Sequence, residues 1–120
     1  MNQERKKLID KLDKIVSKYV VLRDGKCITC WATYGLCCGH LFSRVWMATR
    51  WNLKNCHASC QICNGIHEEN ETPYRNAFIK KYGKEEYDLL NALHNTQSRF
   101  TISELEEMYK QIKQKYDELI

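Results

Sequence analysis

The spacing of apolar residues divides the chain into two helical ends and a middle of a different kind. In the ends, apolar side chains recur every three or four residues with charged residues between them, which is the pattern of amphipathic helices. Asp24-Gly25 ends the first such stretch, because this pair favours a turn. The pattern predicts helices at residues 4–22, 72–82 and 85–94, and from residue 101 onward.

Residues at the ends of these stretches support the boundaries. Thr72-Pro73 has the form of a helix N-cap followed by proline at the first helical position. Gly83 suits a C-cap, and Thr101 with Glu104 has the sequence of a capping box. The apolar residues expected to face inward are Leu8, Leu12, Ile15, Tyr19 and Leu22 in the first helix, Tyr74, Ala77, Phe78 and Tyr82 in the second, Tyr87, Leu90 and Leu93 in the third, and Leu105, Met108, Ile112, Tyr116 and Leu119 in the last.

The middle of the chain, residues 26–56, has no long helical pattern. Short apolar segments around Ile28 and Leu36, separated by glycine and small residues, predict a turn-rich hairpin. A helix is expected to start beyond Cys56 and to carry Cys60, Cys63, Asn64 and His67 on neighbouring faces. Between these parts, the side chains expected to form a small core are Leu41, Phe42, Val45, Trp46 and Met47.

Two Cys-x-x-Cys pairs bracket the middle of the chain. Each pair can present two sulfurs to one ion, and zinc accepts four ligands in a tetrahedron. We therefore predict a structural Zn²⁺ site held by Cys27, Cys30, Cys60 and Cys63. The three other cysteines, Cys37, Cys38 and Cys56, are expected to be free thiols in or near the core.

Composition limits the class of protein. A chain of 120 residues suffices for one small domain, and its formal net charge is +4. Residues 25–67 contain no Asp or Glu but four basic residues, which suits a polyanion such as DNA or RNA. A solvated basic face without a partner is the alternative. An odd number of cysteines, a charged N-terminus and the lack of a signal-peptide core indicate a cytoplasmic protein, and no apolar run is long enough to predict a membrane partner.

One histidine and two asparagines have the order required for metal-assisted phosphodiester hydrolysis. In small nucleases with a ββα-metal core, a histidine on the first strand takes a proton from water, and a divalent cation stabilises the leaving oxygen. An asparagine fixes the connecting loop by hydrogen bonds to the backbone. His40 fits the base, Asn55 the loop position and Asn64 the helix position.

These residues together resemble the zinc-containing HNH endonucleases, and more closely the phage NinG (Rap) recombination family. The motifs that carry the resemblance are Cys27-x-x-Cys30, Gly39-His40, Arg50-Trp51-Asn52, Asn55-Cys56-His57, Cys60-x-x-Cys63-Asn64, Tyr74-Arg75 and Lys80-Lys81-Tyr82-Gly83.

The resemblance implies an α+β, helix-rich fold in a single domain of residues 1–120. A small zinc-bound ββα-metal (HNH) core at residues 26–70 would lie between an N-terminal helix at 1–25 and C-terminal helices at 71–120. It also implies a metal-dependent DNA endonuclease acting on branched or recombining DNA of the Holliday-junction type. Such a protein would be phage-encoded and act in the bacterial cytoplasm. A twofold homodimer is expected for symmetric cleavage, with the outer helices as its interface.

The chain departs from the common HNH pattern at Gly39, where many such enzymes have a metal-binding side chain. The candidate ligands for a catalytic divalent ion are Asn64, His67 and His57, together with Glu68. So few carboxylates would bind Mg²⁺ weakly and suit Mn²⁺ or a similar ion better. The expected DNA contacts are Arg44, Arg50, Arg75, Lys80 and Lys81. A non-catalytic zinc module that binds nucleic acid or protein is the alternative function.

Overall fold

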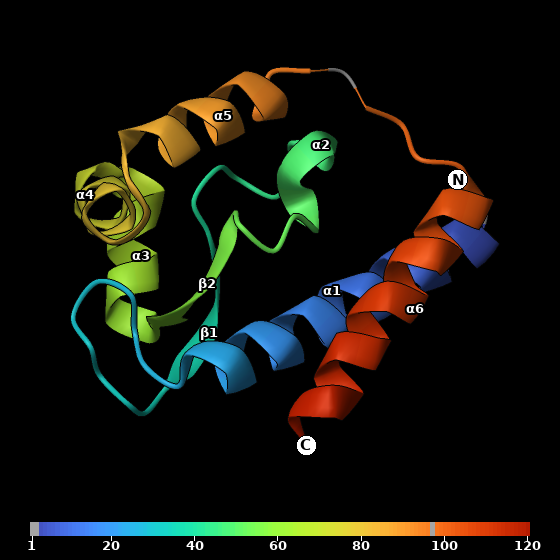
Figure 1. The fold of residues 1–120 in the computed structure, drawn as a ribbon, viewed down its shortest axis with the longest axis horizontal. Coiled ribbons are helices and arrows are strands. Elements are labelled where there is room, and N and C mark those ends of the chain that lie inside the picture. Colours follow the sequence, from blue (N-terminus) through green and yellow to red (C-terminus); the bar gives the residue numbers. More distant parts are fainter. Residues whose placement is uncertain (1–2, 97) are drawn as a thin grey trace.

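The fold is a two-stranded sheet surrounded by helices, and a computed structural model describes it for residues 3–96 and 98–120 (Figure 1). The helix-rich α+β prediction is confirmed, while residues 1, 2 and 97 of the expected ranges lie outside the described residues. The elements in chain order are α1 (Gln3–Asp24), β1 (Leu36–His40), α2 (Met47–Arg50), β2 (Cys56–Cys60), α3 (Gln61–Glu69), α4 (Thr72–Tyr82), α5 (Lys84–His94) and α6 (Ile102–Leu119).

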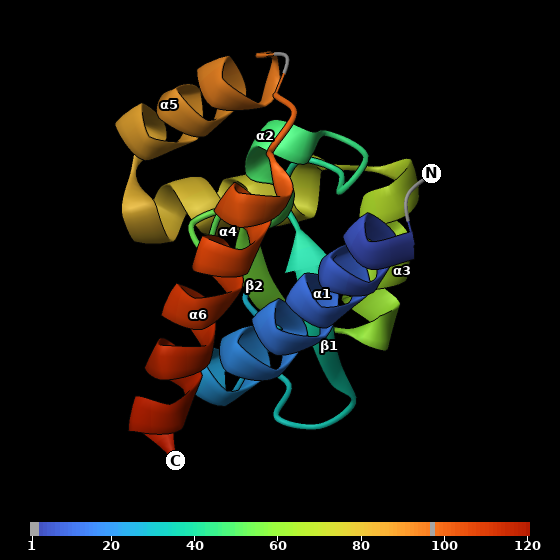
Figure 2. The same cartoon turned by 90° about the vertical axis from the view of Figure 1, so that its right-hand side faces the viewer.

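The first and last helices pack against each other and form one of the two hydrophobic clusters. Figure 2 shows α6 crossing α1 in front of the sheet. The apolar stripe of α1 meets that of α6, and Trp51 and Cys56 complete the cluster from the sheet side. The fully buried or nearly buried members on the two helices are Leu12, Ile15, Val16, Val20, Leu105 and Ile112. The two outer helices therefore cover each other within one chain.

Polar bonds fix α1 at both ends. Arg5 donates to the Phe100 carbonyl at 2.6 Å, just before α6 begins. At the other end, Arg23 donates to the Cys56 carbonyl at 2.8 Å, and Asp24 accepts from the Ala58 amide at 2.8 Å. The capping box predicted at Thr101 and Glu104 is present and starts α6.

The sheet pairs β1 with β2 in antiparallel register, with Gly39 opposite His57 and His40 opposite Cys56. The expected helix does carry Asn64 and His67, but the prediction that it also carries Cys60 was wrong. Cys60 ends β2 and is the N-cap of α3, where its sulfur accepts from the Cys63 amide at 3.4 Å. All five residues of β2 are buried, so the strand lacks the alternation that would have identified it.

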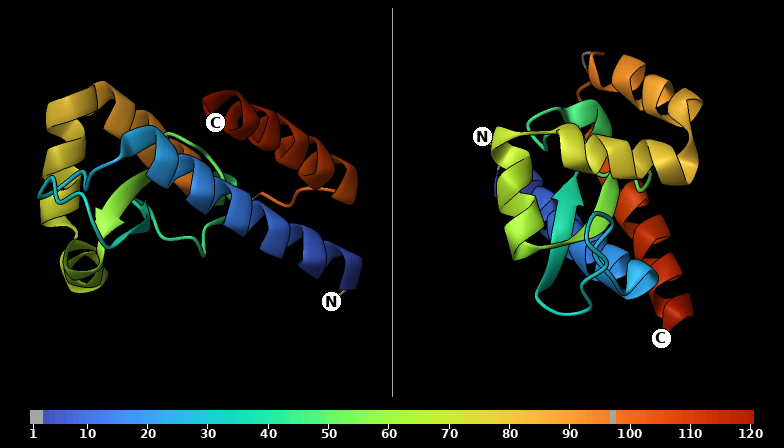
Figure 3. Two further views of the ribbon diagram at one scale, coloured as in Figure 1. Left: turned by 90° about the horizontal axis from the view of Figure 1, so that it is seen from below. Right: turned by 90° about the vertical axis from the view of Figure 1, so that its left-hand side faces the viewer.

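A second, smaller cluster lies on the other side of the sheet (Figure 3). It joins α4 and α5 to the loop after β1 through four buried side chains, Leu41, Tyr74, Phe78 and Leu90. The helix α4 covers the predicted residues 72–82, but its N-cap is Glu71 and not Thr72 as expected.

Several apolar residues expected inside are exposed. Val45 and Trp46, predicted to join a small core, are 73% and 46% exposed. They lie in the loop between β1 and α2. Four residues that were predicted to face inward from the helices are also exposed: Leu22, Tyr82, Leu93 and Leu119. Among the described residues, no helix combines the length and apolarity needed to cross a membrane.

Candidate functional site

The four cysteines of the two Cys-x-x-Cys pairs converge. Their sulfur atoms all lie within 4.8 Å of one another, and the Cys30 and Cys60 sulfurs are 3.6 Å apart. A tetrahedral zinc ion with Zn–S bonds of about 2.3 Å requires sulfurs about 3.8 Å apart. The arrangement is thus compatible with a zinc site formed by Cys27, Cys30, Cys60 and Cys63.

Backbone N–H groups around this cluster favour the thiolate form of one of its cysteines, Cys27. The turn after α1 is attached to β2, because the Ile28 amide donates to the Ala58 carbonyl at 2.9 Å. Burial opposes ionisation of the Cys27 thiol, but backbone N–H groups of Cys30, Cys60 and Thr29 outweigh burial and lower its pKa to about 6. Zinc binds the thiolate form, so this ligand is deprotonated near neutral pH.

A cavity of about 1060 Å³ opens where the end of β1, the following loop, α1, α3 and α5 meet. Three of the predicted functional residues, His40, Asn64 and His67, line it together with Arg44 and Arg50. Three carboxylates also line the cavity, and all of them come from outside residues 25–67, the segment without Asp or Glu: Asp13, Glu68 and Glu71. The cavity is therefore more acidic than the sequence around His40 indicates.

His40 is the last residue of β1, and the backbone of the loop orients its ring. Its Nε2 lies 2.9 Å from the Arg50 carbonyl. Because a carbonyl only accepts, Nε2 carries the proton and the lone pair remains on Nδ1. Burial lowers the pKa of His40 below its usual value, although the hydrogen bond to Arg50 and the charge of Asp13 oppose the shift. The imidazole is consequently neutral at pH 7.

Asn55 holds the loop that carries the Arg50 carbonyl. Its side chain is fully buried and makes three hydrogen bonds to loop backbone. The amide nitrogen donates to the carbonyls of Phe42 at 2.9 Å and Thr49 at 3.1 Å, and the amide oxygen accepts from the Phe42 amide at 2.8 Å. Both ends of the loop are thereby joined through one side chain.

The side chain of Asn64 approaches β1 at Gly39, a residue that has no side chain of its own. A Cβ built on Gly39 would lie 3.3 Å from the Asn64 Oδ1 and 3.0 Å from the Ser59 Cβ. Glu68 follows Asn64 by one turn of α3 and lines the same cavity. The Nε2 atom of His67 bonds with the Leu41 carbonyl at 3.0 Å, and its Nδ1 is buried without a hydrogen-bond partner.

His57 lies apart from this cavity. It is 2% exposed, and its Nδ1 pairs with the Tyr74 hydroxyl at 2.8 Å, which itself donates to the Gly39 carbonyl at 2.8 Å. Burial lowers the pKa of His57 to about 4, so the ring is neutral among its aromatic neighbours. The structure thus places His57 behind Gly39, separate from the residues around His40.

The five predicted DNA-contacting residues do not form one surface. Arg44 is exposed at the cavity, and among the described residues no carboxylate forms an ion pair with it. Arg50 lines the same cavity but binds Asp13 through two nitrogens, at 2.7 and 3.1 Å. Lys80 and Lys81 lie beside the first cysteine pair instead, and Arg75 pairs with Glu71.

Sequence reasoning missed the residues that arrive from distant elements. Asp13, on the polar side of α1, accepts from Arg50 and from the Trp51 indole at 2.8 Å. Hydrogen bonds from these two residues lower its pKa despite burial, so it remains charged. A second convergence, of Cys38, His40 and Cys56, depends on strand register. The Cys38-x-His40 alternation was the only signal for it in the sequence.

Comparison with known proteins gives the family. The family model described as "Bacteriophage Lambda NinG protein" matches residues 2–120. The chain belongs to the NinG family. The ninG protein of Escherichia phage lambda is 32% identical over 81% of this chain and 48% of its own length. Those of Escherichia phage 933W and Enterobacteria phage VT2-Sa are each 30% identical over 81% of this chain and 49% of their own length.

This NinG-family chain spans about half the length of the curated relatives that it matches. No solved structure matches it. The resemblance to NinG inferred from the cysteine, histidine and asparagine motifs is therefore confirmed at the level of the family.

Proposed function

We propose that this NinG-family protein is a metal-dependent DNA endonuclease of the HNH type, with His40 as its general base. The observation that carries the proposal is the state of His40 within its cavity. The ring is neutral, its Nε2 is held by the Arg50 carbonyl, and Asn64 and Glu68 line the same cavity. The order β1, β2, α3, with His40 on the first strand and Asn64 on the helix, supports the proposal because a ββα-metal core would have the same order.

In this proposal each residue has one task. His40 accepts a proton from water as the water oxygen attacks phosphorus, and the phosphodiester bond to the leaving oxygen breaks. The Arg50 carbonyl keeps the imidazole in the tautomer whose Nδ1 can accept that proton. Asn55 holds this carbonyl in place through its bonds to Phe42 and Thr49. Loss of Asn55 would therefore affect the rate through the orientation of His40.

We propose that a divalent cation binds among the oxygens that line the cavity. Asn64 and Glu68 would hold it, one turn apart on α3, and their amide and carboxylate oxygens are ligands that Mg²⁺ and Mn²⁺ accept. When bound, such an ion supplies electrostatic stabilisation of the charge that develops on the leaving oxygen. Gly39 contributes no ligand, and a Cβ there would lie only 3.3 Å from the Asn64 Oδ1, closer than an ordinary van der Waals contact.

The surface near His40 suits branched DNA of the Holliday-junction type, the substrate class that we propose. Arg44 offers a charge for a phosphate, and Trp46 is 46% exposed at the same cavity with its ring edge against His94, 5.1 Å between ring centroids. An exposed indole can stack on a base that is unpaired at a branch point. A twofold dimer would bring two such cavities to symmetric strands.

The test compares two histidines of one cavity. Nicking of plasmid DNA and cleavage of a four-way junction are measured with Mg²⁺ or Mn²⁺ for wild type, His40→Ala and His94→Ala. We expect His40→Ala to lose roughly two to four orders of magnitude in rate while it retains the zinc of the four paired cysteines, the fold and DNA binding. His94→Ala should cleave within about tenfold of wild type, because His94 stacks on Phe42 and makes no bond to the loop carbonyl of Arg50.

Cleavage by His40→Ala at the wild-type rate would refute the assignment. DNA binding without cleavage by wild type, with either ion and on either substrate, would instead support a non-catalytic zinc module.

A further inference from the structure

Three metal-binding side chains converge on the face of the sheet that packs against α1. Cys38 and His40 lie two residues apart on β1, so their side chains leave on one face, and Cys56 is directly opposite His40. One ligand atom from each of these residues lies within 4.8 Å of the other two. Cys37, the neighbour of Cys38, also borders the cavity, but its sulfur donates to the Ser59 carbonyl at 3.2 Å and is not part of the cluster.

One side of the cluster is buried, and the other side faces the cavity. The Arg50 carbonyl accepts from both His40 Nε2, at 2.9 Å, and Cys56 Sγ, at 3.6 Å, so these two groups meet at one point. Cys56 is fully buried, whereas Cys38 and His40 line the cavity. An ion can therefore reach the cluster from the cavity, and the buried thiol closes the site behind it.

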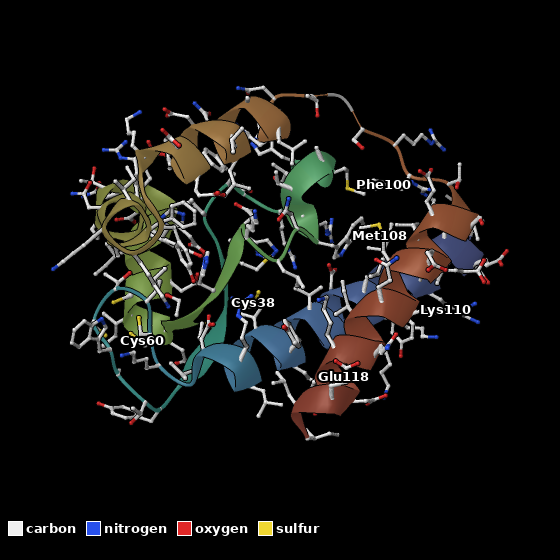
Figure 4. All side chains as sticks on the ribbon, in the orientation of Figure 1. Cys38, Cys60, Phe100, Met108, Lys110 and Glu118 are labelled. Atoms are coloured by element: carbon white, nitrogen blue, oxygen red, sulfur yellow. The ribbon has the colours of Figure 1, made fainter. Side chains whose placement is uncertain are left out.

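The donor set selects the kind of cation. Two thiolates and one imidazole suit Zn²⁺ and other thiophilic ions, and they suit Mg²⁺ poorly because that ion prefers oxygen. Figure 4 shows Cys38 beside α1 and Cys60 at the far end of β2, so this cluster is separate from the four-cysteine site. Three protein ligands leave a fourth position for water or for an inhibitor.

We propose that Cys38, His40 and Cys56 form a second site for a thiophilic cation such as Zn²⁺ or Cd²⁺, which removes His40 from catalysis. The inhibition rests on the proposed nuclease function, whereas the site itself does not. A neutral imidazole has a single ring lone pair, and metal coordination uses it whichever nitrogen binds. His40 cannot then accept a proton from water. Zinc thus has a structural role at the four cysteines and an inhibitory role at this second cluster.

The first measurement is metal stoichiometry, which does not depend on cleavage. Protein kept reduced with a phosphine is titrated with Zn²⁺ against a chromophoric chelator, and then with Co²⁺ to detect thiolate-to-metal charge-transfer absorption. We expect two equivalents in wild type and in Cys37→Ala, the matched control outside the cluster. Cys38→Ala should retain the first equivalent and bind the second far more weakly. Loss of a group that only hydrogen-bonds to a metal ligand already costs roughly 10–100-fold in metal affinity, so loss of a thiolate ligand should cost more.

The second measurement is the rate of plasmid nicking in Mg²⁺ or Mn²⁺ as free Zn²⁺ rises. Each variant is compared with its own rate at low zinc. Wild type and Cys37→Ala should lose activity as the second equivalent binds, and Cys38→Ala should require at least tenfold more zinc for the same loss. Cys56→Ala serves as a second ligand variant, with circular dichroism and the first zinc equivalent reporting its fold.

A single equivalent in wild type overturns the proposal, and so does a second equivalent that survives in both Cys38→Ala and Cys56→Ala. Two equivalents with loss in these variants, but no cleavage by any protein, would establish the metal site and reject the nuclease function. A second equivalent that leaves the nicking rate unchanged would refute the inhibitory role.

Discussion

Replacement of Asn55 by alanine should be among the most damaging single changes outside the metal sites. The side chain is fully buried and makes three hydrogen bonds to the backbone of the loop between the strands. A hydrogen bond contributes about 1 kcal/mol net, and a buried partner left without one costs about 1–3 kcal/mol. Because Phe42 loses both bonds, we expect Asn55→Ala to lower the free energy of unfolding by about 3–5 kcal/mol, a large part of the stability of a small domain.

The assay is urea unfolding of zinc-saturated protein, followed by circular dichroism and by tryptophan fluorescence. Asn52→Ala is the matched control, because Asn52 lies in the same loop and makes one exposed bond, from the Lys54 amide at 2.9 Å. That variant should lose less than about 1 kcal/mol. If Asn55→Ala unfolds at the same urea concentration as Asn52→Ala, the loop does not depend on this side chain. Asn55 would then not position the Arg50 carbonyl either.

Three further predictions concern a close contact, a buried histidine and a phosphate contact. Gly39→Ala should destabilise the protein, since its Cβ would lie 3.0 Å from the Ser59 Cβ. Gly65→Ala in α3 is the control, because its Cβ meets nothing within 4 Å and alanine in a helix should stabilise the protein by about 1 kcal/mol. Urea midpoints that move together would contradict this prediction. The pKa of His57 is lowered to about 4 in the folded protein, so the unfolded state binds more protons below pH 6.5. Stability should therefore fall by about 3 kcal/mol between pH 6.5 and pH 4, and His57→Phe should fall less over the same range; equal slopes would mean that other groups titrate. Arg44→Ala should reduce the slope of log DNA affinity against log salt by about 0.9, while Arg50→Ala, which breaks the ion pair with Asp13, should lower stability and leave that slope unchanged.

Local signals identified the helices because their causes are local. Thr101 and Glu104 satisfy each other's backbone groups wherever the chain folds, and the capping box is present as expected. The strand β2 escaped prediction because tertiary contacts bury all five of its residues and erase the alternation that marks a half-exposed strand. Val45 and Trp46 were assigned to the core from their apolar character, yet their loop leaves them facing solvent beside the cavity.

The candidate site was predictable only in part, for the same reason. The four paired cysteines carry their own spacing signal, and their sulfurs converge. Asp13 gave no such signal, because a charged residue on an amphipathic helix is expected to face water. Its role emerges only when α1 packs beside Arg50 and Trp51. In the same way, the meeting of Cys38 with Cys56 depends on which residue of β1 lies opposite which residue of β2.

The pairing of α1 with α6 has a consequence for how the protein is made. A ribosome completes α1 at Asp24 but begins α6 only at Ile102, which at about 5–20 residues per second is a delay of roughly 4–16 s. Throughout this time the stripe of Leu12, Ile15, Val16 and Val20 has its contacts with Trp51 and Cys56 but lacks those with α6. Until α6 emerges, the part of the stripe that α6 covers stays exposed, and a chaperone can bind it there. Late translational pausing would prolong that exposure and favour aggregation.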